Sequence, residues 1–211
     1  NPLGSIFSFK AMIIMCLFFL FSKKSNGQDQ KIADSLMLIF ESGEYVPGDR
    51  LEILSNLSEN HMDPEKKLHY SQELLEEAES LGDIDKQFKG HLEIGNALKL
   101  QGDLPEALQN YFRAAEIASD NQMTTASGRI SISIADAYSS INNYQVSTSY
   151  YEQAIKILRE ENDTLNLAVA LLNAGDEYYK SGRLDTALLH YRESGEIFRV
   201  LDYKQGEAYN I

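Results

Sequence analysis

The feature that most constrains the fold is a segment that recurs every 40 residues. The stretches GDLPEALQNYFRAAEIA (Gly102–Ala118), NNYQVSTSYYEQAIKIL (Asn142–Leu158) and GRLDTALLHYRESGEIF (Gly182–Phe198) align without a gap. Each has a tyrosine and an isoleucine in the same places, and the segments before them repeat as well. Such a period indicates one small structural unit stacked on copies of itself, because a single unit cannot bury its apolar face alone.

Each unit is predicted to be a pair of helices. Apolar and small residues recur at a spacing of three and four, which indicates one face of a helix. A turn dipeptide separates the two helices of each unit: Gly102-Asp103, Asn142-Asn143 and Gly182-Arg183. Glycine and asparagine can adopt the left-handed conformation that ends a helix, so these dipeptides are suitable stops.

Small residues also recur on both helices, where the helices are expected to cross closely. On the first helix they are Gly95, Ala135 and Gly175, and on the second Ala107, Ser147 and Ala187. The tyrosines of the second helix (Tyr111, Tyr151 and Tyr191) are predicted to fill the space beside them. The repeated letters therefore describe packing.

These patterns resemble the tetratricopeptide repeat (TPR) family. GDEYYKSGRLDTALLHY (Gly175–Tyr191) matches nearly all of the family pattern, and GNALKLQGDLPEALQNY (Gly95–Tyr111) matches most of it. The middle unit departs at Asn142 and Ser147, the family's closing proline is missing, and the usual period is about 34. A period of 40 resembles the subgroup with longer helices. The resemblance implies an all-α, TPR-like α-solenoid of antiparallel helix hairpins, stacked into a right-handed superhelix.

The chain is expected to divide as follows: 1–27, a signal peptide or N-terminal anchor; 28–48, a capping helix and connector; and 49–211, the array. Within the array we predict a degenerate repeat (49–83), three clear repeats (84–122, 123–162 and 163–202) and a truncated one (203–211). In the degenerate repeat, Asp63 and Pro64 are predicted to begin a helix as N-cap and first residue.

The N-terminal segment contains an apolar run, AMIIMCLFFLF (Ala11–Phe21). It is too short to cross a hydrocarbon layer of about 30 Å as a helix, but it has the length of a signal-peptide core. Ser25 and Gly27 would place cleavage before Gln28. Two lysines follow the run instead of preceding it, which argues for the alternatives of an uncleaved anchor or a buried helix. We expect the protein to be exported, either periplasmic or anchored to a membrane.

Charge and motifs argue against several function classes. The chain has 19 basic and 32 acidic residues, so nucleic acid and anionic lipid should repel it. Its single cysteine, Cys16, cannot form a disulfide framework or a zinc site. No phosphate-binding loop, nucleophile elbow or metalloprotease motif is present. We predict no enzyme activity, no metal and no cofactor.

The resemblance also suggests where a ligand would bind. In the family the first helices line a concave wall, and the residue after the small one points into it; here these residues are Asn96, Asp136 and Asp176. An amide can both donate to and accept from a peptide backbone, whereas an ionised carboxylate only accepts, which favours a basic peptide. By the same register, the neighbouring candidates for the groove are Lys89, Leu92, Lys99, Arg129, Ile132, Asn173, Tyr179 and Lys180. The cationic clamp of the chaperone-tail subgroup is not matched, because Leu92 and Ser133 stand where it needs Lys and Asn.

The sequence therefore predicts a non-catalytic scaffold that binds a protein or peptide segment in its concave groove. It resembles the N-terminal sensory region of bacterial signalling proteins, which implies an extracytoplasmic part of a larger protein. The membrane would be contacted only through the N-terminal segment or a region beyond the C-terminus. The alternative is a structural module that self-associates or acts as a spacer, in which the polar inner residues only meet solvent.

Overall fold

The computed structural model of the protein describes residues 26–201, and all of its regular structure there is helical. The predicted signal or anchor segment and the predicted truncated repeat lie almost wholly outside these residues. The helices are α2 (Asn26–Ser42), the short 3₁₀ helix η1 (Pro47–Asp49), α3 (Arg50–Asn60), α4 (Pro64–Leu81), α5 (Ile84–Gln101), α6 (Leu104–Asp120), α7 (Thr124–Ser140), α8 (Tyr144–Glu160), α9 (Thr164–Lys180) and α10 (Leu184–Val200).

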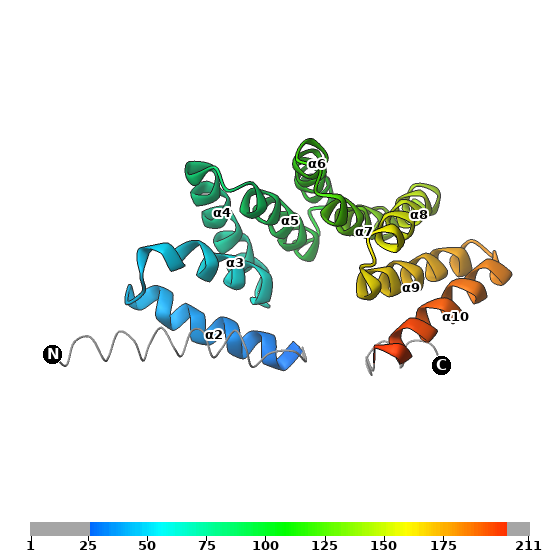
Figure 1. Ribbon diagram of the computed structural model, residues 1–211, viewed down its shortest axis with the longest axis horizontal. Helices are drawn as coiled ribbons and strands as arrows, with labels where there is room; N and C mark the ends of the chain where they lie inside the picture. The colour runs from blue at the N-terminus through cyan, green and yellow to red at the C-terminus, as the bar shows by residue number, and fades with distance from the viewer. Residues whose placement is uncertain (1–25, 202–211) are drawn as a thin grey trace.

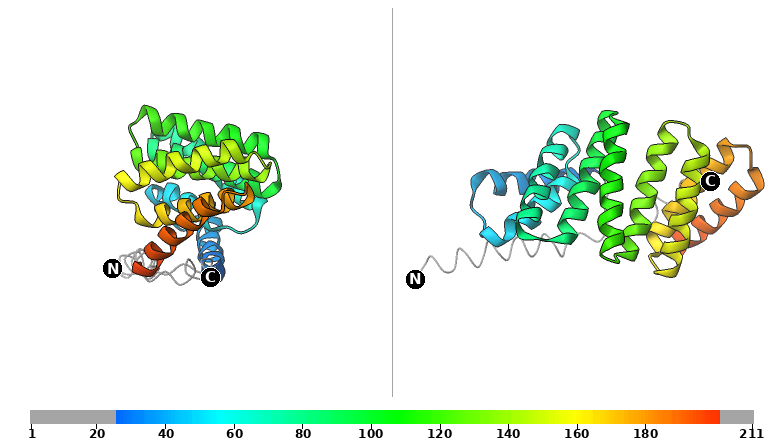
Figure 2. Two further views of the ribbon diagram at one scale, coloured as in Figure 1. Left: turned by 90° about the vertical axis from the view of Figure 1, so that its right-hand side faces the viewer. Right: turned by 90° about the horizontal axis from the view of Figure 1, so that it is seen from above.

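The helices form antiparallel hairpins that stack into an arc (Figure 1). Each helix from α2 to α10 packs against the next one along the chain, and α3, α5, α7 and α9 also contact one another in succession. Helices α5, α7 and α9 lie on the inner side of the arc, and α4, α6 and α8 lie on the outer side. Seen from above, the hairpins stand side by side along the array (Figure 2). The predicted all-α solenoid is confirmed.

The turns between paired helices follow the predicted chemistry. Gly102 has φ of 87°, Asn142 of 58° and Gly182 of 78°, so all three adopt the left-handed conformation. The N–H of Asp103 donates to the carbonyl of Leu98 at 2.9 Å, which satisfies a carbonyl at the end of α5. At the other end of a helix, Asp63 caps α4 by accepting from the backbone N–H of Glu65.

The small residues allow close contact with the tyrosines, as predicted. A Cβ atom placed on Gly95 would lie 2.5 Å from a ring carbon of Tyr111, and one placed on Gly175 would lie 2.7 Å from the same carbon of Tyr191. Tyr111 is completely buried. A side chain larger than glycine at these positions would therefore displace either the ring or the helix.

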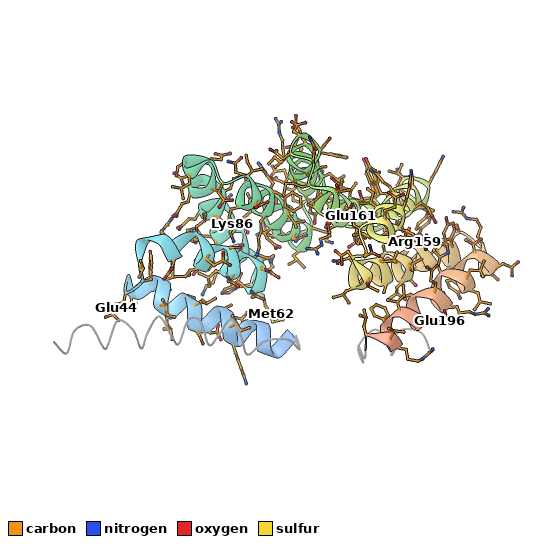
Figure 3. The ribbon with its side chains drawn as sticks, viewed as in Figure 1. Glu44, Met62, Lys86, Arg159, Glu161 and Glu196 are labelled. Atoms are coloured by element: carbon orange, nitrogen blue, oxygen red, sulfur yellow. The ribbon has the colours of Figure 1, made fainter. Side chains whose placement is uncertain are left out.

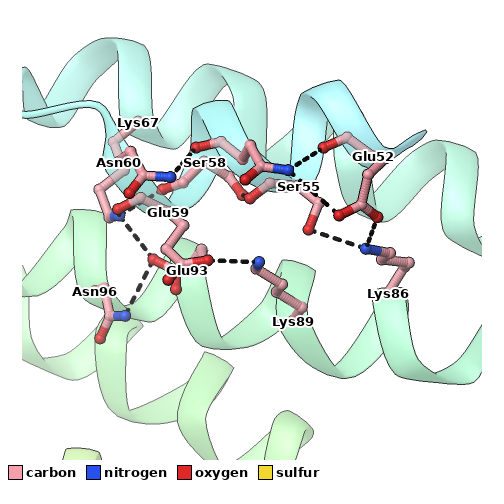
Figure 4. Close-up of polar contacts among 11 residues, drawn as sticks. Glu52, Ser55, Ser58, Glu59, Asn60, Lys67, Lys86, Lys89, Glu93 and Asn96 are labelled. Carbon is pink, nitrogen blue, oxygen red and sulfur yellow. Dashed lines mark hydrogen bonds and ion pairs between the residues drawn. The ribbon is translucent and has the colours of Figure 1, made fainter. Parts of the chain in front are cut away.

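The degenerate repeat lacks this glycine–tyrosine contact and forms a buried ion pair with the next repeat. Counting back 40 residues, Lys67 stands at the position of Ala107 and Ser71 at that of Tyr111. The Lys67 ammonium lies 2.7 Å from the Glu93 carboxylate, and both side chains are at least nine-tenths buried. It also donates to the last carbonyls of α3, including that of Glu59 at 2.9 Å (Figure 4).

Helix α2 covers the N-terminal end of the array. It starts two residues before the predicted Gln28 and packs on α3, where Ala33 and Leu36 join a core with Leu54 and Leu57. None of the helices in residues 26–201 combines the length and apolar character needed to cross a membrane.

Candidate functional site

The three predicted groove residues occupy equivalent places on the inner helices, and each is held by a tyrosine of its paired helix. Tyr111 donates to Asn96 Oδ1 at 2.9 Å, and Tyr191 donates to Asp176 Oδ1 at 2.6 Å. Tyr151 donates to Asp136 in the same way. The sequence pattern predicts only a packing role for these tyrosines, although each follows its partner by 15 residues in every repeat.

Burial and nearby carboxylates keep these tyrosines as hydrogen-bond donors. The pKa of Tyr111, Tyr151 and Tyr191 is raised above its usual value, first by burial and then by the neighbouring acidic side chains. The hydroxyls therefore remain protonated at physiological pH. One acceptor atom of each groove residue is thus already occupied.

Asp136 links all three clear repeats. Its Oδ2 lies 3.4 Å from the Lys99 ammonium of the preceding repeat, and its Oδ1 accepts from the Asn173 amide of the following repeat at 3.2 Å. Two further predicted groove residues therefore meet at Asp136, which is half-buried. The inner wall at this point is a connected polar network.

Asn96 belongs to a second polar network, toward the N-terminal end of the array. Its amide donates to Glu93 at 3.2 Å, and Glu93 in turn pairs with Lys67 (Figure 4). Beside it, Lys89 on α5 pairs with Glu59 on α3 at 2.8 Å. Polar side chains thus join the degenerate repeat to the first clear one.

All four predicted basic groove residues have an acidic partner within the chain. Besides Lys89 and Lys99, Arg129 pairs with Asp163, the N-cap of α9, at 2.7 Å. Lys180 pairs with Glu177 at 2.8 Å. Charged side chains come from both halves of the array, as Lys86 and Arg159 show in Figure 3. The positive charges of these four side chains are therefore balanced by acidic side chains within the chain.

The other predicted groove residues differ in accessibility. Asp176 is exposed, and Tyr179, one turn later on α9, is 63 % exposed. Leu92 is half-buried, whereas Ile132 is buried in the core. The C-terminal half of the inner wall therefore presents the most accessible side chains of the predicted set.

Glu177 is a buried charge on α9 that the sequence pattern did not predict. Glu177 is 1 % exposed and accepts from the hydroxyl of Ser139 on α7 at 2.7 Å, in addition to its pair with Lys180. The equivalent residues of the earlier repeats, Ala97 and Ala137, are completely buried. An acidic residue in register with two buried alanines was the signal that could have revealed it.

Several solved structures share this fold. A Rap protein complexed with Competence and Sporulation Factor aligns with a TM-score of 0.79 at 17 % identity, over 84 % of this chain and 51 % of the Rap chain. Bacillus thuringiensis PlcR, in complex with the peptide PapR7 and DNA, aligns with a TM-score of 0.71 at 15 % identity, over 96 % of this chain and 72 % of PlcR.

A signal-transduction ATPase of Pyrococcus horikoshii with a tetratricopeptide repeat sensor aligns with a TM-score of 0.69 at 21 % identity. That alignment covers 86 % of this chain and 29 % of the ATPase. No curated protein matches the sequence. The model of the tetratricopeptide repeat family matches residues 88–160 and 134–199, which together span more than half of the chain. The chain therefore belongs to the tetratricopeptide repeat family.

Proposed function

We propose that the protein is a non-catalytic scaffold whose concave face binds a protein or peptide segment. The observation that carries the proposal is the row of Asn96, Asp136 and Asp176 on successive inner helices, each oriented by a tyrosine. A row with a constant repeat suits an extended chain, whose backbone polar groups also recur regularly. The Rap and PlcR structures, both of which contain a bound peptide or factor, support the proposal through their shared fold.

The charges on the inner wall favour a neutral or cationic segment. The predicted basic groove residues are each paired with an acid, so an acidic ligand would have to compete with those acids. Asp176, in contrast, is exposed and has Tyr179 beside it, and an exposed carboxylate next to an aromatic ring attracts a cationic side chain.

Selection from a displayed peptide library against the full chain tests this proposal, followed by affinity measurements with the selected peptides. Replacing Asp176 by Ala should weaken binding at least severalfold and leave the helical circular dichroism unchanged. Ser149→Ala, at an exposed position on the outer helix α8, is the matched control and should bind normally. Equal binding by both variants would contradict the groove assignment.

We further propose that the array is the extracytoplasmic sensory or interaction region of a larger signalling protein. The apolar run at Ala11–Phe21 supports export, and the sensor role of the tetratricopeptide repeats in the Pyrococcus ATPase supports signalling. Expression of the full chain in a bacterium, followed by cell fractionation and N-terminal sequencing, tests the export. An unprocessed protein in the cytosolic fraction would contradict it.

Self-association is a second candidate function, and the exposed face of α10 favours it. Leu184, Leu188 and Leu189 are all more than half exposed, whereas Thr148, the counterpart of Leu188 on α8, is buried. Sedimentation velocity of the full chain and of Leu188→Glu separates the two functions. A dimer that the substitution dissociates would support self-association, and a monomer in both would leave the groove as the functional surface.

A further inference from the structure

The outer helices of the second and third clear repeats are joined by two pairs of side chains. Glu152 Oε1 on α8 lies 3.2 Å from His190 Nε2 on α10, and Arg159 Nη2 on α8 lies 2.7 Å from Glu193 Oε1 on α10. In the described part of the chain, no ion pair joins α6 to α8 in the same way. The two connections between outer helices are therefore specific to the second and third repeats.

The surroundings of His190 suit the doubly protonated ring. Its Nδ1 lies 2.9 Å from the backbone carbonyl of Thr186, and its Nε2 faces the Glu152 carboxylate. Both partners can only accept, and a neutral imidazole has a single N–H to donate. Only the imidazolium can satisfy both contacts at once.

Glu152 is at the same time tied to the inner helix of the third repeat. The hydroxyl of Tyr178 on α9 donates to Glu152 Oε1 at 2.6 Å, and the Tyr178 ring lies 4.9 Å from the His190 ring. The guanidinium of Arg183, in the turn before α10, stacks on Tyr178 at 4.3 Å. Side chains from α8, α9 and α10 thus converge on one carboxylate.

The preceding repeats have different chemistry at these positions. Tyr150 stands where His190 does, and its ring stacks on that of Tyr138, the counterpart of Tyr178, at 6.0 Å. Phe112 occupies the position of Glu152 one repeat earlier. The joint between the first two clear repeats is therefore aromatic at these positions, whereas the next joint contains a histidine and a carboxylate.

We propose that His190 makes the joint between the second and third clear repeats sensitive to pH. Protonated His190 adds a second connection between α10 and α8, and the neutral ring leaves the Arg159–Glu193 pair to hold α10 there. The connection restrains the outer wall, because α8 lies on the outer side of the arc while α7 and α9 lie on the inner side. Loss of the His190–Glu152 connection loosens this restraint, so that the third repeat can tilt relative to the second and change the curvature of the inner side. This proposal does not depend on peptide binding.

The neighbouring charges determine the pH range. The pKa of His190 is raised above its usual 6.5, first by the hydrogen bond to Glu152, while burial opposes the rise; the Thr186 carbonyl and the Glu193 carboxylate add to it. The pKa of Glu152 is lowered, first by the hydrogen bond from His190, with Tyr178 and Arg159 contributing. Burial, followed by the bond to Glu152, raises the pKa of Tyr178 to about 12.

The directions of these pKa shifts determine how the stability of the joint depends on pH. The stability contributed by His190 is fully present below the pKa of the unfolded chain and is lost as the pH rises through the raised folded pKa. The contribution of Glu152 is lost only as the pH falls through its own lowered pKa. The joint is therefore held more firmly below the usual pKa of histidine and loosens as the pH rises through the raised pKa of His190.

The test compares the full-length wild-type chain with His190→Asn, which introduces the residue found at position 110 in the first clear repeat. Hydrogen exchange of the α10 amides is measured for both proteins at about pH 5.5 and about pH 8.5. At the lower pH we expect the variant to lose protection in α10 severalfold relative to the wild type, and at the higher pH we expect the two to agree. Comparison at one pH removes the intrinsic pH dependence of exchange.

His91→Asn is the matched control. His91 faces Asn110 across the two helices of one repeat, so its loss should leave α10 unchanged at both pH values. NMR titration of the His190 ring in the wild type should give a midpoint above the usual value, and Glu152→Gln should lower that midpoint. A normal or lowered midpoint in the wild type, or a loss of α10 protection that is equal at both pH values, would overturn the proposal.

Discussion

The Lys67 ammonium lies 2.7 Å from the Glu93 carboxylate, and both side chains are almost completely buried between the degenerate repeat and the first clear one. A lysine thus occupies the position that a small residue holds in the other repeats. The ammonium also caps the C-terminal end of α3, because it donates hydrogen bonds to the backbone carbonyls of Ser58 and Glu59. A buried charge pair therefore joins the N-terminal end of the array to the first clear repeat.

Removing only one member of this pair should lower the free energy of unfolding. We expect Lys67→Met to destabilise the protein by about 3 kcal/mol, because Glu93 would be left buried without its partner. The double substitution Lys67→Met with Glu93→Leu should recover most of that loss, since neither charge then remains buried. Urea unfolding followed by circular dichroism gives both values. A double variant no more stable than the single one would argue against the ion pair as the cause.

The glycines beside the tyrosines should differ in their tolerance of a methyl group. Gly95→Ala should destabilise by about 1–3 kcal/mol, because Tyr111 is completely buried and its ring cannot move aside. Gly175→Ala should cost less, because Tyr191 is only partly buried. Thermal unfolding of the two variants measures the difference, and a larger effect at Gly175 would contradict this account of the packing.

The contribution of each tyrosine hydroxyl to stability should depend on how deeply its acceptor is buried. Tyr151→Phe removes a donor from half-buried Asp136 and is expected to cost about 1–2 kcal/mol. Tyr191→Phe removes a donor from exposed Asp176, where water can replace it, so we expect less than about 0.5 kcal/mol. Chemical denaturation of the two variants against the wild type provides the comparison. Equal costs would mean that burial of the acceptor is not the deciding factor.

His61 should respond to pH in the opposite sense to His190. It is buried, its Nδ1 accepts from the backbone N–H of Asp63, and burial lowers its pKa below the usual 6.5. Its contribution to stability is present above the unfolded pKa and is lost as the pH falls through the folded one. The free energy of unfolding of the wild type relative to His61→Asn should therefore decrease between about pH 7.5 and about pH 5. A relative stability that rises over this interval would show that the ring is charged in the folded state.

The sequence by itself determined the architecture. The 40-residue period, the Gly or Asn at each turn, and the small residues opposite each tyrosine were sufficient to predict stacked helix hairpins. These signals are local or strictly periodic, so they can be read without knowing how distant parts of the chain meet. The N-cap at Asp63 and the left-handed turn at Asn142 were predictable for the same reason.

Only the tertiary structure decided which polar groups pair on the inner wall. The sequence placed Lys99 and Asp136 in the groove register but could not reveal that they bind each other, or that Asn173 joins them. The same holds for Lys67 with Glu93 and for Glu177 with Ser139. Each of these contacts joins different repeats, and side-chain atoms that far apart in the chain meet only at the spacing and tilt that helix packing sets.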